Sequence, residues 1–305
     1  MKCAVLFLIF NRLDKAKAVF AEIKKAKPPK LYIASDGARA NIKGEKEAVE
    51  NIRRQVLDNI DWGCDVKTLF RNENLGCGIA VSEAVTWFFE HEEQGIILED
   101  DCVPSQTFFT FCDELLDKYK DNKEIWTIAG ANPAGETESK YSYIFSKIFA
   151  GWGWAAWADR WQHYSYNLTG YDESFIDEFS SKPHIRKFYK KKFQAFNYPG
   201  HFNNWDWQAQ FMVMRSKGLN IHPVKNLVTN IGEDGYHCQR SKNHPLLNKK
   251  HYDLETVIHP PQVICDDKYT DFLIKLHCGS GNRLLKFLCW FIPGKSLRYK
   301  LRRAG

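Results

Sequence analysis

The first hundred residues alternate between strand-like and helix-like segments, and this alternation constrains the fold more than any other feature of the sequence. Short apolar runs typical of buried strands are separated by longer segments whose apolar residues recur at helical spacing. Strands that alternate with helices form right-handed βαβ crossovers and hence a parallel sheet. The expected strands are residues 4–10, 31–34, 66–70, 95–98 and 125–129, and the expected helices are residues 13–27, 45–60 and 79–90. We therefore expect an α/β fold with a mostly parallel central sheet flanked by helices.

Polar residues follow four of these expected strands at the point where each one ends. The segments concerned are Asn11-Arg12, Asp36-Gly37, Arg71-Asn72 and Glu99-Asp100-Asp101. A parallel sheet binds its ligands beyond the carboxyl ends of its strands. We therefore expect these four segments to line one site.

The composition and the periodicity of the sequence change after residue 130. Residues 141–265 are rich in Trp, Tyr, Phe and His and show weak periodicity, which suggests a second half that faces another ligand. The length of 305 residues suits one large α/β domain or two modest ones. We expect three parts, namely residues 1–130, residues 131–265 and a C-terminal segment at residues 266–305.

The positive charge of the chain is concentrated near its C-terminus. Residues 272–305 hold eight Lys and Arg side chains and no Asp or Glu, so the rest of the chain carries a net charge of −2 within a total of +6. This distribution argues against a nucleic-acid-binding domain. Because apolar residues accompany the cations, the C-terminal segment is either attracted to an anionic membrane surface or packed as a helix on the body.

The apolar run at residues 3–10 is far shorter than the ~20 residues of a membrane-spanning helix. No small-residue cleavage site follows it, so we expect a first strand and not a signal peptide. The nine cysteines form no C-x-x-C pair, which disfavours a zinc ribbon or a disulfide framework. These features predict a cytoplasmic protein. Together with the basic C-terminal segment, they predict that it is held peripherally on the inner face of the membrane.

Three consecutive acids, Glu99-Asp100-Asp101, form what we call the acidic motif. Adjacent carboxylates repel one another unless a cation neutralises them. Their hard oxygen ligands suit Mg²⁺ or Mn²⁺ bound together with a diphosphate. The alternative is a cluster that caps the helix expected to start near residue 106.

Other candidate ligand contacts lie at the remaining strand ends. Asp36 can accept from a nucleotide base and Arg12, next to Phe10, can pair with phosphate or ribose, although Asp36-Gly37 is also an ordinary turn signal. The segment from Arg71 through Asn74 and Gly76 to Gly78 places glycines before a helix, which permits close backbone approach to an anion.

The aromatic half adds three candidates. Of the tryptophans after Gly151, Trp152 and Trp154 are candidates to line a sugar site, whereas Trp157 and Trp161 are expected in the core. Asp206, between Trp205 and Trp207, is either a general base whose pKa apolar surroundings raise or a structural carboxylate. His237 is either a ligand of a metal or diphosphate, or a structural histidine.

In order along residues 4–237, these segments resemble the N-acetylglucosaminyltransferase I family of GT-A glycosyltransferases. The resemblance is carried by the first strand with Asn11-Arg12, by Ser35-Asp36, by the acidic motif with Phe108-Phe109 downstream, by the Gly151–Trp154 loop and by Trp205-Asp206-Trp207. The segment from Arg71 to Gly78 is more similar to bacterial GT-A enzymes that build surface polysaccharides.

The resemblance implies a GT-A (Rossmann-like) fold and a metal-dependent, inverting transfer from a nucleotide-diphosphate sugar. It implies that Asp101 ligates the metal, that Glu99 and Asp100 contact the nucleotide sugar, that Asp36 binds the base with Arg12 nearby, and that Asp206 is the catalytic base. The family has two adjacent acids before the second tryptophan, so this last assignment depends on aligning the chain at Asp206-Trp207.

The expected protein is therefore a hexosyl- or N-acetylhexosaminyltransferase that uses Mn²⁺ or Mg²⁺ and a nucleotide-diphosphate sugar, expected to be a UDP-sugar. Residues 1–130 would bind the donor and residues 131–265 a glycan or lipid-linked acceptor of surface polysaccharide or lipopolysaccharide synthesis. Two alternatives remain. A sugar nucleotidyltransferase usually carries a glycine-rich, basic triphosphate loop near its first strand, and none is visible. A non-catalytic carbohydrate-binding protein would explain the aromatic residues but not three acids at a strand end.

Overall fold

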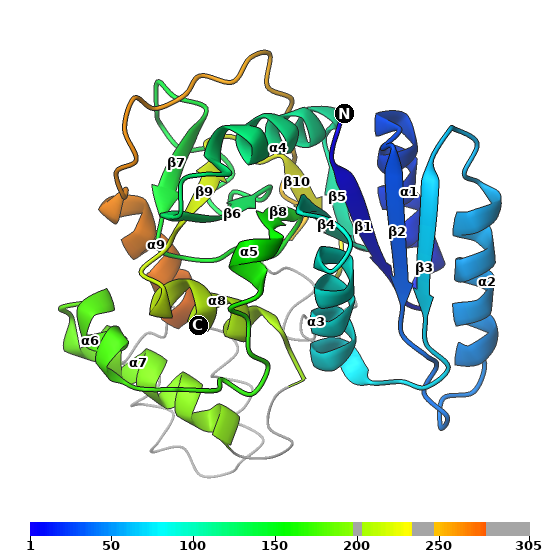
Figure 1. Cartoon of the computed structure of the whole chain (residues 1–305), viewed down its shortest axis with the longest axis horizontal. Coiled ribbons are helices and arrows are strands. Elements are labelled where there is room, and N and C mark those ends of the chain that lie inside the picture. The colour runs from blue at the N-terminus through cyan, green and yellow to red at the C-terminus, as the bar shows by residue number, and fades with distance from the viewer. Residues whose placement is uncertain (198–202, 234–246, 279–305) are drawn as a thin grey trace, which may run out of the picture.

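The computed structural model describes residues 1–197, 203–233 and 247–278 (Figure 1). Its strands are β1 (Ala4–Ile9), β2 (Lys30–Ser35), β3 (Asp65–Phe70), β4 (Gln94–Glu99), β5 (Cys102–Pro104), β6 (Ile125–Ala129), β7 (Tyr143–Ser146), β8 (Trp154–Trp157), β9 (Leu219–Pro223) and β10 (Val228–Asn230). Its helices are α1 (Leu13–Ala26), α2 (Glu45–Asp58), α3 (Gly76–Phe89), α4 (Gln106–Tyr119), α5 (Ala158–Trp161), α6 (Ser174–Phe179), α7 (Pro183–Gln194), α8 (Asp206–Arg215) and α9 (Asp267–Cys278), with a 3₁₀ turn at Ala195–Asn197.

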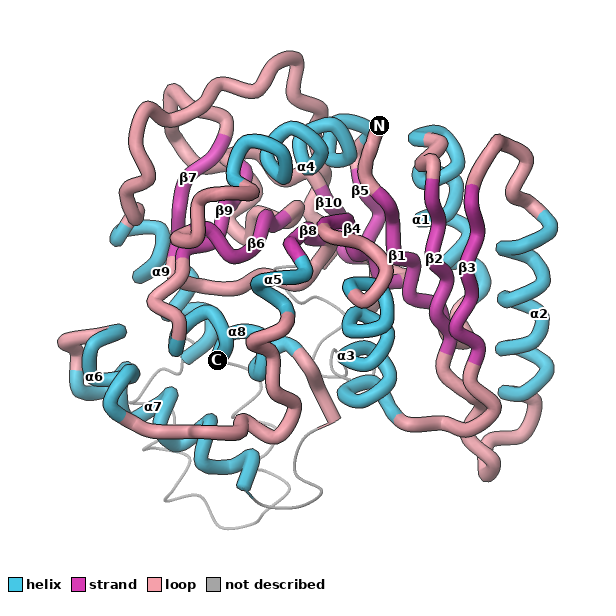
Figure 2. The backbone as a smooth tube through the Cα atoms, in the orientation of Figure 1, coloured by secondary structure: helices cyan, strands magenta, loops and turns pink. Residues whose placement is uncertain are grey.

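Eight strands form one mixed sheet in the order β3-β2-β1-β4-β8-β6-β9-β7. Strands β1 to β4 are parallel, and β6 and β9 run in the same direction, whereas β7 and β8 run the opposite way. Strands β5 and β10 pair separately as an antiparallel two-stranded sheet. The expected α/β class with a mostly parallel sheet flanked by helices is therefore confirmed, and Figure 2 shows the sheet between its helices.

Strand β1 is central because both of its faces are buried. Its residues Val5, Phe7 and Ile9 belong to a core with α1, α2 and α4, whereas Ala4, Leu6 and Leu8 belong to a core with α3, α5 and α8. Successive side chains of a strand point to opposite faces, so a continuous apolar run is what a strand covered on both faces requires. This explains why residues 4–10 contain no alternation of polar and apolar residues.

The helices of the second half enclose a third core. Helices α6, α7 and α9 pack their apolar side chains against residues of α8, including Phe211 and Met214. The start of the C-terminal segment predicted at residues 266–305 is thus α9, a helix packed on the body. The rest of the predicted membrane-binding segment, residues 279–305, lies outside the described residues.

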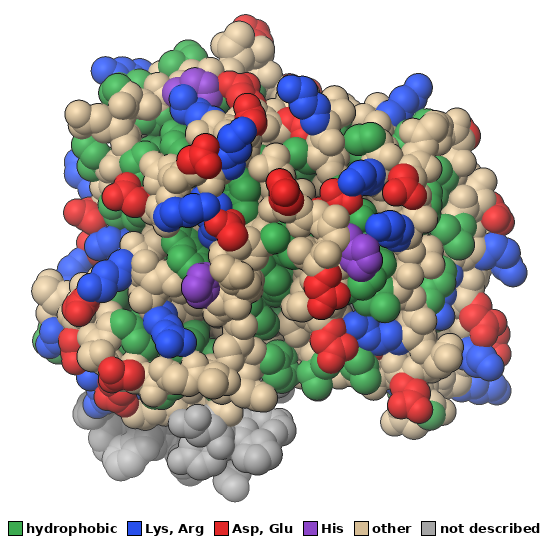
Figure 3. Space-filling model, viewed as in Figure 1, with side chains coloured by type: hydrophobic (Ala, Val, Ile, Leu, Met, Phe, Trp, Pro, Cys, Tyr) green, Lys and Arg blue, Asp and Glu red, His purple; other side chains and the backbone are tan. Residues whose placement is uncertain are grey.

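The surface agrees with the charge distribution read from the sequence. On the face seen in Figure 3, basic and acidic side chains are interspersed over the described elements. Among the described residues, none of the helices combines the length and the apolar character needed to cross a membrane.

The buried histidine of β9 makes the stability of the fold dependent on pH. The side chain of His222 is fully buried, and its Nε2 is 2.8 Å from the carbonyl oxygen of Ile148. Burial lowers the pKa of His222 from its ordinary value near 6.5 to about 4. Below pH 6.5 the unfolded chain therefore binds a proton that the folded chain does not, and stability is lost as the pH falls toward 4.

We expect the variant H222Q to lose this part of the pH dependence, because glutamine stays neutral while its amide can still donate to Ile148. From pH 7 to pH 5, the free energy of unfolding of the wild type should fall by about 2 kcal/mol more than that of H222Q. Urea unfolding at the two pH values measures this difference. Parallel pH profiles for the two proteins would contradict it.

Candidate active site

The register of the parallel strands brings the four predicted polar segments to one edge of the sheet. Ile9 pairs with Ser35 and Ser35 pairs with Phe70, while Leu8 pairs with Glu99. The residues that follow β1, β2, β3 and β4 therefore leave the sheet side by side. In Figure 1, β1 begins beside the N label and runs downward, so this edge is the lower one.

The guanidinium of Arg12 lies between two carboxylates of the acidic motif. Its Nη1 donates to Oδ2 of Asp101 at 2.9 Å, and its Nη2 donates to Oδ1 of Asp100. The Arg12 side chain is 24% exposed, and those of Asp100 and Asp101 are 5% and 13% exposed. This double ion pair joins the end of β1 to the end of β4.

One guanidinium does not fully compensate three neighbouring carboxyl groups. Burial, together with Asp101 and Asp100, raises the pKa of Glu99 well above its ordinary value, and Arg12 opposes this rise. Burial also raises the pKa of Asp100 to about 6, against the opposing effect of Arg12. Ionisation of all three carboxyl groups would therefore leave negative charge that Arg12 does not balance, and a further cation would favour the ionised forms.

Phe10 contributes mainly through its backbone, which is one of the causes that lower the pKa of the Asp100 carboxyl. Its ring is half-buried, and the guanidinium carbon of Arg39 lies 5.8 Å from the ring centre. Arg39 is itself paired with the buried carboxylate of Glu45, which also accepts from Asn11. The contact of Phe10 with a nucleotide stays a prediction.

A segment that sequence reasoning did not single out covers the acidic motif. The N–H of Ile231 donates to the backbone oxygen of Asp101 at 2.8 Å, and Lys15 on α1 donates to the carbonyl of Ile231 at 2.6 Å. A Cβ on Gly232 would lie 2.1 Å from Oδ2 of Asp101. A larger residue at this position would have to displace the Asp101 side chain, and the sequence offers no local signal for this contact because it is made by residues distant in the chain.

Asp36 organises the loops between β2 and α3. Its carboxylate accepts from the backbone N–H groups of Gly37, Leu75 and Gly76 at 3.0 Å and from the side-chain amide of Asn74 at the same distance. A carboxylate with this many donors is held in a fixed orientation. Binding of a base by Asp36 stays a prediction, and in the structure Asp36 holds the loop that contains Asn74 and Gly76.

Arg71 is turned toward α3. Its guanidinium donates to the carboxylate of Glu83 at 3.1 Å and to the carbonyl of Ala80 at 3.4 Å. Its own carbonyl accepts from Arg53 on α2, which also donates to the carbonyls of Ser35 and Asp36. Arg53 thus links the ends of β2 and β3, a role that its place in an amphipathic helix did not reveal.

Trp154 does not line the site, contrary to its predicted place among the cofactor contacts. It has no exposed surface, and its ring is stacked on that of Trp205 with the centroids 5.6 Å apart. Trp157 and Trp161 are buried in the core, as predicted. Trp154 is buried because β8, the strand that it begins, lies between β4 and β6 in the interior of the sheet.

The same aromatic packing positions Asp206. Trp205 is buried against Trp154 and Phe149, and a Cβ on Gly151 would lie 2.9 Å from its ring. Asp206 follows directly as the first residue of α8 and is exposed. The predicted apolar enclosure of its carboxylate is therefore absent, because Trp205 points into the core.

Asp206 nevertheless belongs to the same electrostatic environment as the acidic motif. Its charge contributes to the raised pKa of Glu99 and to that of Cys77 in the first turn of α3, for which burial is the largest cause. Oδ1 of Asn203 accepts from the N–H of Gly78 at 2.8 Å, so the segment before α8 rests on the start of α3. Sequence reasoning did not single out Cys77 or Asn203, because nothing local indicates this contact.

The donor atoms of the acidic motif suit a divalent cation shared with phosphate. Asp101 offers hard carboxylate oxygens at a half-buried position, and Oδ2 of Asp100 is buried without a hydrogen-bond partner. Among the described residues, no three His, Cys, Asp or Glu side chains gather into a metal site. Mg²⁺ and Mn²⁺ are commonly held by one or two carboxylates together with substrate phosphates. The predicted ligand His237 lies outside the described residues.

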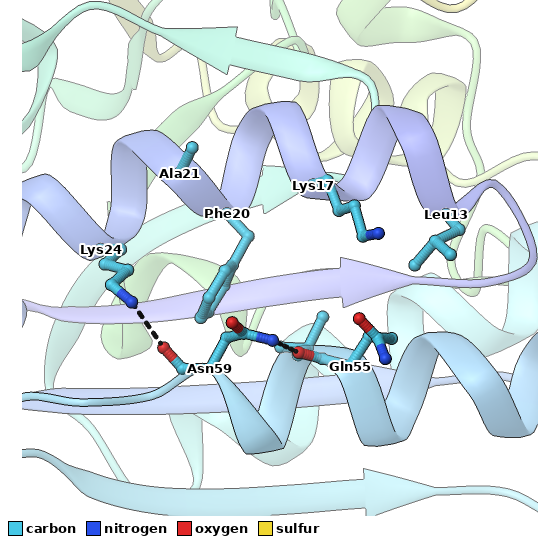
Figure 4. Close-up of a pocket in the computed structure, with 8 residues that line it drawn as sticks. Leu13, Lys17, Phe20, Ala21, Lys24, Gln55 and Asn59 are labelled. Atoms are coloured by element: carbon cyan, nitrogen blue, oxygen red, sulfur yellow. Dashed lines mark hydrogen bonds between the residues drawn. The ribbon is translucent and has the colours of Figure 1, made fainter.

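A groove between α1 and α2 does not contribute to this site (Figure 4). It is lined by Leu13, Lys17, Phe20, Ala21, Lys24, Gln55, Val56 and Asn59, none of which is a predicted site residue. Lys24 closes one end by donating to the carbonyl of Asn59 at 3.2 Å.

No protein-family model matches the chain, and no curated protein matches it. The glycosyltransferase GlyE of Streptococcus pneumoniae is 13% identical over 73% of this chain and 45% of its own, with a TM-score of 0.37. Mouse xyloside xylosyltransferase 1 is 10% identical over 69% of this chain and 81% of its own, with a TM-score of 0.35. UDP-glucose pyrophosphorylase, solved with UDP-glucose, is 10% identical over 75% of this chain and 93% of its own, with a TM-score of 0.38. Such similarity concerns the α/β architecture and assigns no activity.

We expect G232A to destabilise the protein by about 1–3 kcal/mol, because the added methyl group would displace either the Asp101 carboxylate or the segment that carries it. G63A is the matched control, since a Cβ on Gly63 meets nothing within 4 Å. Its free energy of unfolding should change by less than about 0.5 kcal/mol. Urea unfolding compares the two variants, and equal stability would show that residue 232 is not packed on Asp101.

Proposed function

We propose that this protein is a glycosyltransferase that moves a sugar from a nucleotide-diphosphate sugar to a hydroxyl group of an acceptor. One observation supports the proposal above the others. The fold gathers a general-base candidate, Asp206, and an acidic motif paired with Arg12 around the carboxyl edge of a parallel sheet. Donor diphosphate and acceptor hydroxyl need these two kinds of group on opposite sides of the reacting carbon.

In the proposed reaction, the carboxylate of Asp206 accepts the proton of the acceptor hydroxyl. The oxygen attacks the anomeric carbon from the face opposite the diphosphate, and the bond between that carbon and the diphosphate oxygen breaks. The electron pair leaves with the nucleoside diphosphate, so the sugar is transferred with inversion. The exposure of Asp206 suits this role, because the acceptor must reach it from solvent.

The negative charge that develops on the leaving diphosphate requires cations near the acidic motif. Arg12 is one, since its guanidinium can donate two parallel hydrogen bonds to phosphate. A divalent ion bound at Asp101, Mn²⁺ or Mg²⁺, would supply Lewis-acid neutralisation of the same group. Glu99 and Asp100 would then orient the nucleotide sugar, as the resemblance to the N-acetylglucosaminyltransferase I family implies.

The finer assignments belong to the same proposal. The donor is a UDP-sugar, the transferred group is a hexose or an N-acetylhexosamine, and the acceptor is a glycan or a lipid-linked intermediate of surface polysaccharide or lipopolysaccharide synthesis. The protein would work at the cytoplasmic face of the membrane, to which its basic C-terminal segment would be attracted.

The variant D206N should lower kcat for sugar transfer about 10²–10⁴-fold while leaving donor binding unchanged, because only the proton acceptor is lost. The measurement is release of the nucleoside diphosphate with a panel of nucleotide sugars and acceptors, alongside the thermal shift caused by the donor. D117N, which alters an exposed aspartate on α4, is the control. Undiminished activity of D206N would place the base elsewhere, and formation of a nucleotide sugar from a nucleoside triphosphate would favour a nucleotidyltransferase.

The variant D101N should abolish the part of UDP binding that depends on Mn²⁺, because it removes the charged oxygen ligand from the acidic motif. Isothermal titration with UDP, with Mn²⁺ and with EDTA, measures this loss. If D101N and the wild type respond to Mn²⁺ alike, Asp101 is not the metal ligand.

A further inference from the structure

Arg12 occupies the oxygen atom that a divalent ion would need. It donates to Oδ2 of Asp101, whereas Oδ1 of the same carboxylate lies 3.4 Å from both the thiol of Cys102 and the side-chain amide of Asn230. Gly232 lies beside Oδ2, since a Cβ added to it would be 2.1 Å from that atom. An ion that binds Oδ2 would therefore lie next to the guanidinium, as close as two ligands of one oxygen atom.

Arg12 lies in the connection between β1 and α1, so its side chain is not part of a regular helix or strand. Arg12 precedes α1 as its N-cap residue, and the structure gives it no capping hydrogen bond from its side chain. Its side chain is 24% exposed, so solvent reaches part of the guanidinium group's surroundings. The backbone of Phe10 would still favour the ionised form of Asp100 after the guanidinium had left.

The charges favour an exchange over simultaneous binding of both cations. Burial lowers the pKa of Arg12, but Asp100 and Asp101 raise it more, so the guanidinium stays charged. A divalent ion and a guanidinium on the same carboxylate oxygen would repel each other strongly at such short range. An arriving diphosphate provides a new anionic partner whose geometry suits the planar guanidinium.

We propose that Arg12 holds the cation position of the acidic motif in the ligand-free protein and transfers to the donor diphosphate when a divalent ion binds Asp101. This inference rests on the proposed function, because the diphosphate is the anion that receives Arg12. It implies that the ion binds weakly in the absence of nucleotide and that Arg12 and the ion compete for Asp101.

Titration of the full chain with Mn²⁺ alone, followed by the electron paramagnetic resonance of the free ion, tests the competition. The variant R12A should bind Mn²⁺ at least about tenfold more tightly than the wild type, because the competing cation is gone. R12K should lie close to the wild type, since lysine still supplies a positive charge. R54Q, which removes an exposed arginine on α2, controls for net charge and should match the wild type.

Two further measurements test whether Arg12 and the ion compete for Asp101. The double variant R12A/D101N should lose the gain in Mn²⁺ affinity, and tight binding there would mean that the ion sits elsewhere. Saturating Mn²⁺ should leave R12A with about tenfold weaker UDP binding than the wild type, because the diphosphate lacks its guanidinium. Circular dichroism and the melting temperature establish that each variant is folded.

Equal Mn²⁺ affinity of R12A and the wild type would overturn the exchange, as would weaker binding by R12A. These titrations contain no nucleotide sugar, so their outcome is separate from that of the transfer assay. Absence of sugar transfer or hydrolysis by the wild type, with the Mn²⁺ results as expected, would refute the proposed function and leave the competition at Asp101 established.

Discussion

The double ion pair of Arg12 with Asp100 and Asp101 is the interaction on which the architecture of the site depends. Without a cation, three consecutive acids at the end of a buried strand would repel one another, and their burial would disfavour the charged forms. Arg12 reaches them because β1 and β4 are adjacent and parallel, so the two strands end together. The interaction thus exists only where the sheet order places these two strands side by side.

Around this pair, much of the predicted ligand-binding set acts as a scaffold. The Asp36 carboxylate accepts hydrogen bonds from the backbone N–H groups of residues 75 and 76. Arg53 donates to the backbone carbonyl groups of the residues that follow β2 and β3. Such groups cannot stay unpaired near a buried surface at low cost. Their pairing gives the loops fixed shapes, and fixed loops are what a diphosphate site needs to be preorganised.

The aromatic packing around Trp205 fixes the position at which α8 begins. Trp205 stacks on Trp154, and the carbonyl of Trp205 accepts from the hydroxyl of Tyr164 at 3.2 Å. The first residue of α8 is thereby fixed relative to β8, and β8 is hydrogen-bonded to β4, which carries the acidic motif. A continuous path of packed side chains and strand pairing therefore links Asp206 to Glu99.

The sequence by itself determined the α/β class, nearly every element of the first 130 residues, and the meeting of four strand ends, because apolar periodicity and strand direction are local properties. It predicted α3 only from residue 79, whereas α3 begins at Gly76, where residues 203 and 204 pack on the first turn. Tertiary structure alone decided the burial of Trp154, the exposure of Asp206 and the close approach of residue 232 to Asp101. Each of these depends on contacts between segments far apart in the chain, and such contacts follow from strand order and packed volume, which no local pattern encodes.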